Sequence, residues 1–303
     1  SLGAASLSTY AGRGIIPSSD PLHFGAPLAR PSSVDVIASA DLVIVMGSEL
    51  SEVDLWRDTL GHTARLVRVD IDPEVLCDRH GADYAILADC FAVLDQLSDL
   101  FDAPLDTDWT AAEVTKARAK WRSEVEAERV GILPVVDALR EGLPVDTLIY
   151  SDMTQFAYAA KEVWPMEQSG LWHHPCGFGT LGYALPAAIG GKIGAGDQPV
   201  VAIAGDYGFQ YTLQELMVAV ELNLCLPIII WDNGKLGEIE DSMVHAQIAP
   251  NAVVQKNPDF VKLADAYGCA TAAPKSFVDL KAAVIKALGA DGPTVIHVTS
   301  EIN

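Results

Sequence analysis

Apolar residues along this chain form short runs of strand length that alternate with stretches of helical period. The clearest example starts with an apolar run at residues 200–204, continues with a helical stripe at about 212–223, and ends with a second apolar run at 226–231. A strand, a helix and a strand in this order predict a βαβ unit, in which the two strands are parallel and the crossover is right-handed.

Polar residues follow both strands of this unit. Asp206 comes just after the first run, and Asn233 comes 27 positions later, just after the second. Because neighbouring parallel strands end at the same edge of a sheet, we expect both side chains at that edge, where open α/β sheets bind ligands. A carboxylate and an amide oxygen suit Mg²⁺ or Ca²⁺ better than zinc, although each residue alone would be an ordinary turn residue.

Glycines beside these residues predict an anion site next to the cation. Gly205 and Gly208 let the backbone approach a ligand closely, and the N–H groups around Gly208 precede the predicted helix. Mg²⁺ with a diphosphate is therefore the expected occupant.

The same alternation covers the rest of the chain. Further strands are predicted at residues 41–47, 65–72, 85–89, 147–150 and 294–299. Further helices are predicted at residues 33–40, near Pro73, and at 90–100, 109–130, 134–140, 183–191, 258–267 and 276–288. Strands that alternate with helices predict the α/β class with parallel sheets.

The pattern divides into two doubly wound, three-layer domains. Residues 1–105 form the first and residues 131–303 the second, with a linker and bridging helix at 106–130. The linker stretch, residues 101–108, overlaps the end of the first domain and is acidic and without period; the charged helix after it, at 109–130, is expected to be solvent-exposed. The residues after Asp241 are expected to form a loop up to the helix at 258–267.

Composition narrows the class of partner. The 303 residues carry a formal net charge of −21 and a pI near 4.5, which argues against nucleic acid and anionic membranes as partners. The sequence contains no run of 18 apolar residues and nothing like a signal peptide. Five cysteines without C-x-x-C spacing favour a reducing, cytoplasmic setting.

Several motifs resemble one known family. GDYGFQ at residues 205–210 and DNGKLGE at 232–238 resemble the GDG…NN motif of thiamine diphosphate-dependent enzymes of the acetolactate synthase, pyruvate oxidase and benzoylformate decarboxylase superfamily. SDMTQ at 151–155 and GFGTLGYALPAAIG at 177–190 also match, in particular acetolactate-synthase-like and 5-guanidino-2-oxopentanoate decarboxylase-like proteins. Residues 40–52, ADLVIVMGSELSE, resemble the central domain of the same superfamily.

Two residues depart from the usual motif. Tyr207 stands where a second glycine is usual, and Asp232 stands where a first asparagine is usual. Neither departure removes a metal-binding side chain. Tyr207 does put the backbone conformation in question, because a bulky residue resists positive φ.

The resemblance implies a set of site residues. It assigns Mg²⁺ to the side chains of Asp206 and Asn233 and to the main-chain carbonyl of Lys235. Cofactor-binding positions are Thr154, Gln155, Gly179, Thr180, Leu181, Gly205, Asp206, Tyr207, Gly208, Asn233, Gly237 and Glu238. By the resemblance, Gln155 touches the diphosphate, the Gly179 carbonyl accepts the pyrimidine amine, and Leu181 wedges between the two rings. From the residues alone, Thr154 could equally cap a helix and Leu181 could be a core residue.

The resemblance also implies the reaction. A 2-oxo acid loses CO₂ on thiamine diphosphate, and the product is either an aldehyde or, with a second 2-oxo acid, an acetolactate-type compound. The glutamate that activates the cofactor in this superfamily lies in a pyrimidine-binding domain, and no position of this sequence matches it. His174 and Glu238 are the weak catalytic candidates that remain. The family also admits FAD in the central domain, which nothing in this sequence supports.

We therefore expect the C-terminal part of a 2-oxo acid decarboxylase or carboligase, with an incomplete central domain and no pyrimidine domain. Such a chain would form a homodimer or homotetramer, or pair with a chain that carries the pyrimidine domain. Two alternatives remain open: a natural subunit of a split decarboxylase, and a non-catalytic cofactor- or metabolite-binding module.

Overall fold

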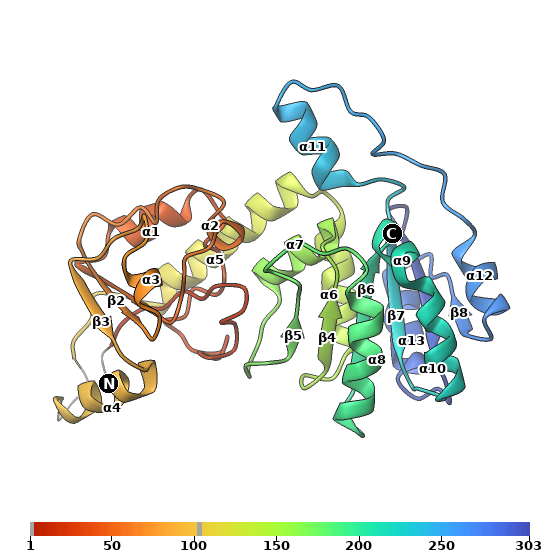
Figure 1. Cartoon of the computed structure of the whole chain (residues 1–303), viewed down its shortest axis with the longest axis horizontal. Helices are drawn as coiled ribbons and strands as arrows, with labels where there is room; N and C mark the ends of the chain where they lie inside the picture. The colour runs from red at the N-terminus through yellow and green to blue at the C-terminus, as the bar shows by residue number, and fades with distance from the viewer. Residues whose placement is uncertain (1–2, 102–104) are drawn as a thin grey trace. The chain divides into compact units, whose positions relative to one another are not determined.

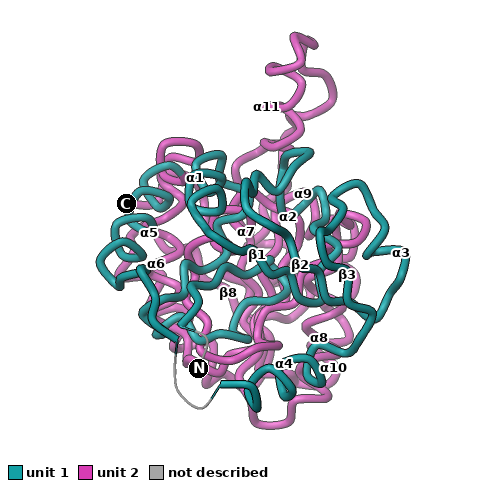
Figure 2. The backbone as a smooth tube through the Cα atoms, turned by 90° about the vertical axis from the view of Figure 1, so that its left-hand side faces the viewer, with its two compact units in different colours: residues 1–124 teal, residues 125–303 magenta. Residues whose placement is uncertain are grey.

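The computed structural model describes residues 3–101 and 105–303 and divides the chain into two compact units, Ser1–Glu124 and Val125–Asn303 (Figures 1 and 2). They are called unit 1 and unit 2 below. Part of the predicted linker, residues 102–104, lies outside the described residues. The division falls inside a helix, α5 (Ala111–Glu128). No helix among the described residues is long and apolar enough to cross a lipid bilayer.

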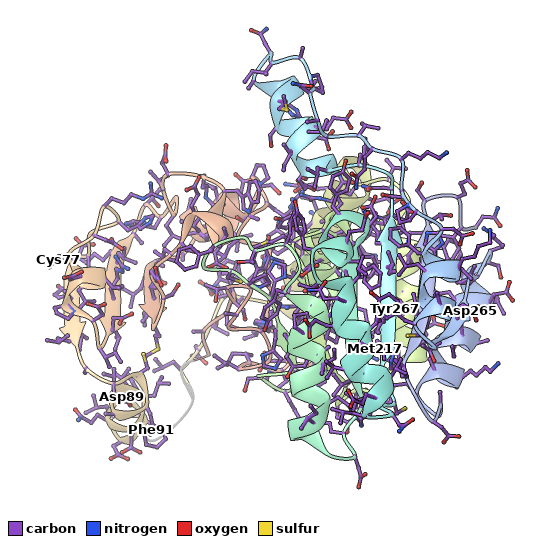
Figure 3. All side chains as sticks on the ribbon, turned by 45° about the vertical axis from the view of Figure 1, so that its right-hand side comes forward. Cys77, Asp89, Phe91, Met217, Asp265 and Tyr267 are labelled. Carbon is purple, nitrogen blue, oxygen red and sulfur yellow. The ribbon has the colours of Figure 1, made fainter. Side chains whose placement is uncertain are left out.

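Unit 1 contains a three-stranded parallel sheet in the order β1-β2-β3. Its strands are β1 (Leu42–Met46), β2 (Arg65–Asp70) and β3 (Tyr84–Leu87), and its short helices are α1 (Ser33–Ala38), α2 (Glu52–Leu55), α3 (Pro73–Leu76) and α4 (Cys90–Asp99). The predicted strands are confirmed, each within a few residues. All four residues of β3 are exposed and α4 buries none of its residues, as Phe91 illustrates (Figure 3).

The charged helix α5 is not simply solvated, which corrects the expectation for it. Val114 and Trp121 are buried and pack against Phe24, and the Trp121 indole donates a hydrogen bond of 3.1 Å to the Ser32 hydroxyl. Val125, near the end of the helix, is fully buried in the core of unit 2. The apolar stripe was not recognised in the sequence because it has only one buried apolar residue every one or two turns, among many charged residues.

Unit 2 contains a six-stranded sheet in the order β5-β4-β6-β7-β9-β8, in which every neighbouring pair is parallel. The strands are β4 (Leu148–Ser151), β5 (Trp172–His173), β6 (Val200–Gly205), β7 (Pro227–Asp232), β8 (Ala270–Ala272) and β9 (Thr294–Thr299). The helices are α6 (Ile132–Gly142), α7 (Gln155–Val163), α8 (Ala184–Ala195), α9 (Asp206–Thr212), α10 (Leu216–Glu221), α11 (Gly237–His245), α12 (Phe260–Ala266) and α13 (Phe277–Ala287).

Helices cover both faces of this sheet. Val201 and Ile203 of β6 join the core that α6 and α13 complete, whereas Val200 and Ala202 join the core that α8, α10 and α12 complete. Alternate residues of one strand thus feed opposite cores, which explains why the central strands read as unbroken apolar runs. The α/β class with doubly wound parallel sheets is confirmed.

The helix after β6 starts earlier than predicted. It begins at Asp206 as α9, passes through a 3₁₀ turn at Leu213–Glu215 and continues as α10, so Gly208 lies inside the first helix instead of before it. The buried Phe209 anchors that first turn to the core. Tyr207 lies in the first turn of α9 and is not among the positive-φ residues of the described chain. The departure from glycine therefore causes no backbone strain.

The predicted loop after Asp241 is partly wrong. Helix α11 spans Gly237–His245 and projects from the body of unit 2, followed by a long return segment to α12 (Figure 1). Its side chains are mostly exposed, so the burial pattern that marks a helix in sequence is missing. The short strands β5 and β8, of two and three residues, were not predicted either.

Candidate functional site

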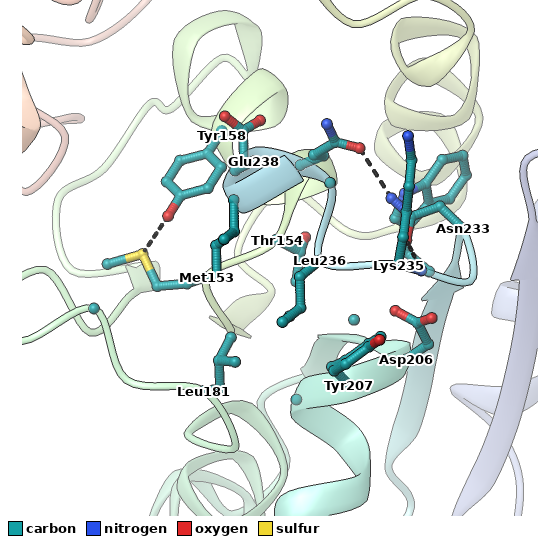
Figure 4. Close-up of a pocket in the computed structure, with 17 residues that line it drawn as sticks. Met153, Thr154, Tyr158, Leu181, Asp206, Tyr207, Asn233, Lys235, Leu236 and Glu238 are labelled. Atoms are coloured by element: carbon teal, nitrogen blue, oxygen red, sulfur yellow. Dashed lines mark hydrogen bonds between the residues drawn. The ribbon is translucent and has the colours of Figure 1, made fainter. Parts of the chain in front are cut away.

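A pocket of about 250 Å³ lies at the carboxyl ends of β6 and β7 in unit 2 (Figure 4). Every predicted cofactor-binding residue except Thr180 lines it, and so does Lys235. The lining also includes residues that were not predicted, namely Met153, Tyr158, Trp231, Leu236 and Ile239. The structure therefore gathers residues that lie up to 86 positions apart, from Met153 to Ile239.

Three helices begin at this pocket. The N-cap and first residue of α7 (Thr154, Gln155), of α9 and of α11 all lie on its wall. The first N–H groups of a helix have no partner within the helix and carry its positive dipole end. Three such ends around one pocket make it suitable for a polyanion such as a diphosphate.

Thr154 acts as a helix cap. Its hydroxyl oxygen accepts a hydrogen bond of 3.0 Å from the Ala157 N–H, which is the alternative that the sequence left open. The cap fixes the start of α7 at the pocket, and Gln155 follows as its first helical residue. The Gln155 amide bonds to Asn233 of the pocket wall and to Asp241 of α11, since it accepts from Asn233 Nδ2 at 2.9 Å and donates to Asp241 at 3.2 Å.

Asp206 and Asn233 lie at the same end of the pocket (Figure 4). The register of β6 and β7 pairs Gly205 with Trp231, which brings the residues after the two strands together. Asp206 is 3% exposed, and burial raises its pKa to about 6, with the nearby charge of Asp232 adding to the effect. The Asn233 side-chain oxygen accepts from the Lys235 N–H at 3.3 Å. The ammonium group of Lys235 pairs with Glu240 at 2.6 Å.

Asp232 lies at the centre of a hydrogen-bond network that the sequence did not predict. One of its carboxylate oxygens accepts from the Asn257 amide at 2.8 Å and from the Gly234 N–H at 3.0 Å. The other lies 2.8 Å from His297 Nε2. Burial raises the pKa of Asp232, but the bonds from His297 and Asn257 outweigh it and hold the pKa below its usual range. An asparagine in place of Asp232 could not accept on both sides in this way.

Asp152 is a second buried carboxylate beside the site. It accepts hydrogen bonds from the N–H groups of Gly182 (3.2 Å) and Ala184 (2.7 Å), and burial raises its pKa to about 6 in spite of them. These bonds attach the glycine-rich turn and the start of α8 to the end of β4. Gly179 (φ +62°) and Gly182 (φ +84°) give this turn its left-handed backbone.

The turn contributes Gly179 and Leu181 to the pocket, whereas Thr180 lies outside its lining. Leu181 faces the pocket together with Met153 and Tyr158, at the end away from Asp206 (Figure 4). The pocket thus has a polar end with a carboxylate and an end with larger apolar surface. A ligand with a charged part and a ring part fits this arrangement.

The two adjacent histidines point to different partners. The ring of His173 stacks on Tyr150 at 4.6 Å between ring centroids. His174 Nδ1 lies 2.9 Å from the Ser151 hydroxyl, and its Nε2 lies 3.1 Å from the Met153 sulfur. His174 therefore does not line the pocket itself but contacts Met153, which does.

Glu238 lines the pocket and forms an ion pair with Arg129, which was not predicted as a site residue. Arg129 Nε donates to Glu238 at 2.9 Å, and Arg129 is 7% exposed. Burial lowers the pKa of Arg129, but the surrounding carboxylates, Glu238 first, raise it by more. The pKa of Arg129 is therefore above its usual value. No sequence pattern links Arg129, at the end of a charged helix, to the first turn of α11 more than a hundred residues away. The pair attaches the start of α11 to the body of unit 2.

The residues of the pocket fit a divalent cation with an anionic ligand. Two buried atoms on its wall, the Tyr207 hydroxyl and the Trp231 indole nitrogen, have no hydrogen-bond partner among the described residues. Such atoms are rare in folded proteins, and a polar ligand would supply the missing partner. The described residues contain no cluster of three His, Cys, Asp or Glu side chains that could hold a metal. A cation here would depend on one carboxylate with amide and carbonyl oxygens, which is a donor set for Mg²⁺.

The fold and this pocket define a parallel α/β protein with a pocket at the carboxyl ends of its central strands. Two family models match the chain: the thiamine pyrophosphate enzyme C-terminal TPP binding domain at residues 152–298, and the thiamine pyrophosphate enzyme central domain at residues 1–97. The chain belongs to the thiamine pyrophosphate (thiamine diphosphate) enzymes, as the motifs suggested.

Curated relatives agree with this assignment. A probable 2-ketoarginine decarboxylase of Pseudomonas aeruginosa is 37% identical over 298 residues, which cover 98% of this chain and 53% of the relative. The acetolactate synthase isozyme 3 large subunit of Escherichia coli is 30% identical over 215 residues (68% and 38%). The acetolactate synthase large subunit of Cyanidium caldarium is 26% identical over 303 residues (95% and 52%). The chain thus spans about half the length of these relatives, or less.

Proposed function

We propose that this chain provides the diphosphate- and Mg²⁺-binding half of a thiamine diphosphate-dependent enzyme that acts on 2-oxo acids. The observation that supports it best is the convergence of three helix starts with Asp206 and Asn233 on one pocket. When bound, thiamine diphosphate supplies the electron sink that allows a 2-oxo acid to lose CO₂.

Different residues of the pocket would bind different parts of the cofactor and its metal ion. The N–H groups at the starts of α7 and α11 would bind the diphosphate, and Asp206, Asn233 and the Lys235 carbonyl would hold Mg²⁺. Leu181, at the opposite end, would pack against the ring part of the cofactor. Gln155 and Arg129 would keep Asn233 and Glu238 in place, because each already bonds to its partner.

The 303-residue chain alone is expected to turn over slowly. The glutamate that the family uses to activate the cofactor matches no position of this sequence, and Glu238 is held by Arg129. A homodimer or homotetramer, or a partner chain that carries a pyrimidine domain, would complete the site. Decarboxylation and carboligation both remain compatible with the pocket, and 2-ketoarginine is the first substrate to test because one relative carries that name.

Calorimetric titration with thiamine diphosphate, with and without Mg²⁺, tests the proposal. We expect Mg²⁺-dependent binding to the wild-type chain and none to Asp206→Asn, which keeps the shape of the side chain but loses its charge. Asp72→Asn in unit 1 is the matched control and should bind like the wild type. The absence of metal-dependent heat in the wild type would favour a non-catalytic module. Decarboxylation of a 2-oxo acid only after addition of a chain with a pyrimidine domain would favour a split enzyme.

A further inference from the structure

Asn257 occupies an unusual position between two carboxylates. Its side-chain nitrogen donates to Asp206 Oδ2 at 2.6 Å and to Asp232 Oδ1 at 2.8 Å. Its side-chain oxygen accepts from Gln210 Nε2 at 3.3 Å, and that same nitrogen also donates to the Asp206 carbonyl at 3.0 Å. Both N–H groups of one neutral amide are thus used on Asp206, which follows β6, and Asp232, which ends β7.

The fold brings Asn257 to this place although it lies far from the motif in sequence. The chain leaves the sheet after Asn233, forms α11 and returns. Backbone contacts join the segment before α11 to the segment that returns. Lys235 and Val254 form an antiparallel bridge, and the Leu236 N–H donates to the Val253 carbonyl at 2.8 Å. Val253 is buried. Asn257 follows the returning segment directly, just before α12. It therefore lies at the same strand ends as Asn233.

Asp232, one of the two departures from the usual motif, takes part in the same network. Asp232 accepts from Asn257 with one oxygen, and its other oxygen accepts from His297 Nε2 when that nitrogen carries the proton. An aspartate can accept on both sides, whereas an asparagine could accept on only one. Asp232, Asn257 and His297 then form one connected support that reaches from β9 to Asp206.

We infer that Asn257 is a positioning residue for the cation site: it holds Asp206 by one carboxylate oxygen and leaves the other for the metal. This inference depends on the proposed function, since Asp206 is the carboxylate that would bind Mg²⁺. Hydrogen bonds to a ligating carboxylate fix its orientation, and their loss commonly weakens metal affinity by about 10- to 100-fold. Without Asn257, Asp206 and Asp232 would also lose the one amide group that bonds to both carboxylates.

Mn²⁺ binding, followed by electron paramagnetic resonance in the presence of thiamine diphosphate, tests this role without requiring turnover. Mn²⁺ reports on a Mg²⁺ site because it takes the same oxygen ligands. Asn257→Leu keeps the branched shape and removes both donors, Asn257→Ala also removes most of the side chain, and Asn257→Gln keeps the donors. Asn251→Ala is the matched control, because Asn251 is an exposed asparagine of the same return segment.

We expect Asn257→Leu and Asn257→Ala to bind Mn²⁺ at least about tenfold more weakly than the wild type, with Asn257→Gln between them and the wild type. Asn251→Ala should match the wild type. Either folded donor-free variant decides the question, and circular dichroism identifies which are folded. Wild-type affinity in the Leu or Ala variant would overturn the inference, as would a Gln variant as weak as Leu. A wild type that binds no Mn²⁺ would instead overturn the proposed function, and it would do so before any variant is compared.

Discussion

Units 1 and 2 both place polar residues at the carboxyl ends of parallel strands, but they use them differently. In unit 1 the residues after β1 and β2 satisfy their own loops: the Ser48 hydroxyl accepts from the Leu50 N–H, and Asp72 caps α3 through the Glu74 N–H. In unit 2 the residues after β6 and β7 face a pocket at which three helices begin. The rule that open α/β sheets bind ligands at the carboxyl ends of their strands would by itself have suggested a site in both units.

Burial of the strands differs in the same way. All six residues of β6 are buried, whereas all four residues of β3 are exposed. A strand enclosed on both faces holds its carboxyl end rigidly, so a side chain such as Asp206 can be presented at a fixed position. The comparison indicates that a strand-end site needs converging helix starts and an enclosed strand in addition to a suitable polar residue.

The largest effect is expected from Arg68→Met in unit 1. Arg68 is 1% exposed, pairs with Asp78 at 2.5 Å and donates to the Ser48 carbonyl at 3.1 Å. Arg68→Met removes two hydrogen bonds from a buried guanidinium, one to the partly exposed Asp78 and one to the Ser48 carbonyl, and should lower the free energy of unfolding by about 3 kcal/mol. Hydrogen exchange by mass spectrometry should show loss of protection in β2 with little change in β6.

The control for this variant is Arg79→Met, which removes an exposed pair with Asp58 at 3.5 Å. It should change the free energy of unfolding by no more than about 0.5 kcal/mol. If Arg68→Met lowered protection in β6 as much as in β2, the two units would unfold together and the comparison between them would lose its basis.

The pH dependence of Asp152 should give the next largest effect, in unit 2. Burial raises its folded-state pKa from 3.8 to about 6. A carboxyl group whose pKa is raised on folding favours the folded state below its unfolded pKa, and this contribution is lost as pH rises through about 6. The loss between pH 4 and pH 6 should be of the order of 2 kcal/mol.

Urea unfolding of the wild type and of Asp152→Asn at pH 4 and pH 7 measures this contribution. The difference in unfolding free energy between the two pH values should be smaller in the variant. Asp72→Asn, a helix-capping aspartate of unit 1, should keep the wild-type difference. An unchanged difference in Asp152→Asn would show that Asp152 does not titrate in this range.

The sequence predicted the part of unit 2 that rests on continuous burial. The runs that became β6 and β7 are apolar at nearly every position because both faces are covered, and their ends located Asp206 and Asn233. The pocket also gathered the residues that the resemblance implied, apart from Thr180. Their roles toward a cofactor stay predictions.

The missing parts of the site depend on contacts across the sequence. Asn257 reaches Asp206 only because the chain leaves the sheet and returns, and Arg129 reaches Glu238 from a helix that read as solvated. The start of α9 was missed because glycine and aspartate after a strand usually indicate a turn. Local patterns carry no information on which distant residue satisfies a buried carboxylate.

Gly208→Ala should have an intermediate effect and sharpens the comparison inside unit 2. A Cβ atom at this position would lie 2.2 Å from Asp152 Oδ2, so the carboxylate that holds the glycine-rich turn would have to move. We expect a loss of about 1 to 2 kcal/mol in unfolding free energy, together with weaker cofactor binding by calorimetry.

Gly194→Ala in α8 is the matched control, since a Cβ there meets nothing within 4 Å. It should be neutral or stabilise the helix by up to about 1 kcal/mol. Equal loss in both variants would argue against a tight contact at Gly208.

Glu238→Gln should have the smallest effect and tests whether side-chain pairs hold a helix start at the pocket. Glu238 is half-buried and pairs with the buried Arg129, which also lies 2.8 Å from Glu128. Because Arg129 keeps that second partner, the loss in unfolding free energy should be only about 1 kcal/mol. Hydrogen exchange should rise in α11, whose start the pair attaches to unit 2, and remain unchanged in α7. Glu240→Gln removes the Lys235 pair farther along the same helix and should raise exchange there less, because both partners of that pair are more exposed than Arg129. If exchange in α11 were the same in Glu238→Gln as in the wild type, the backbone contact between Leu236 and Val253 would be what holds the helix. Glu238 would then again be a candidate for a direct role in the pocket.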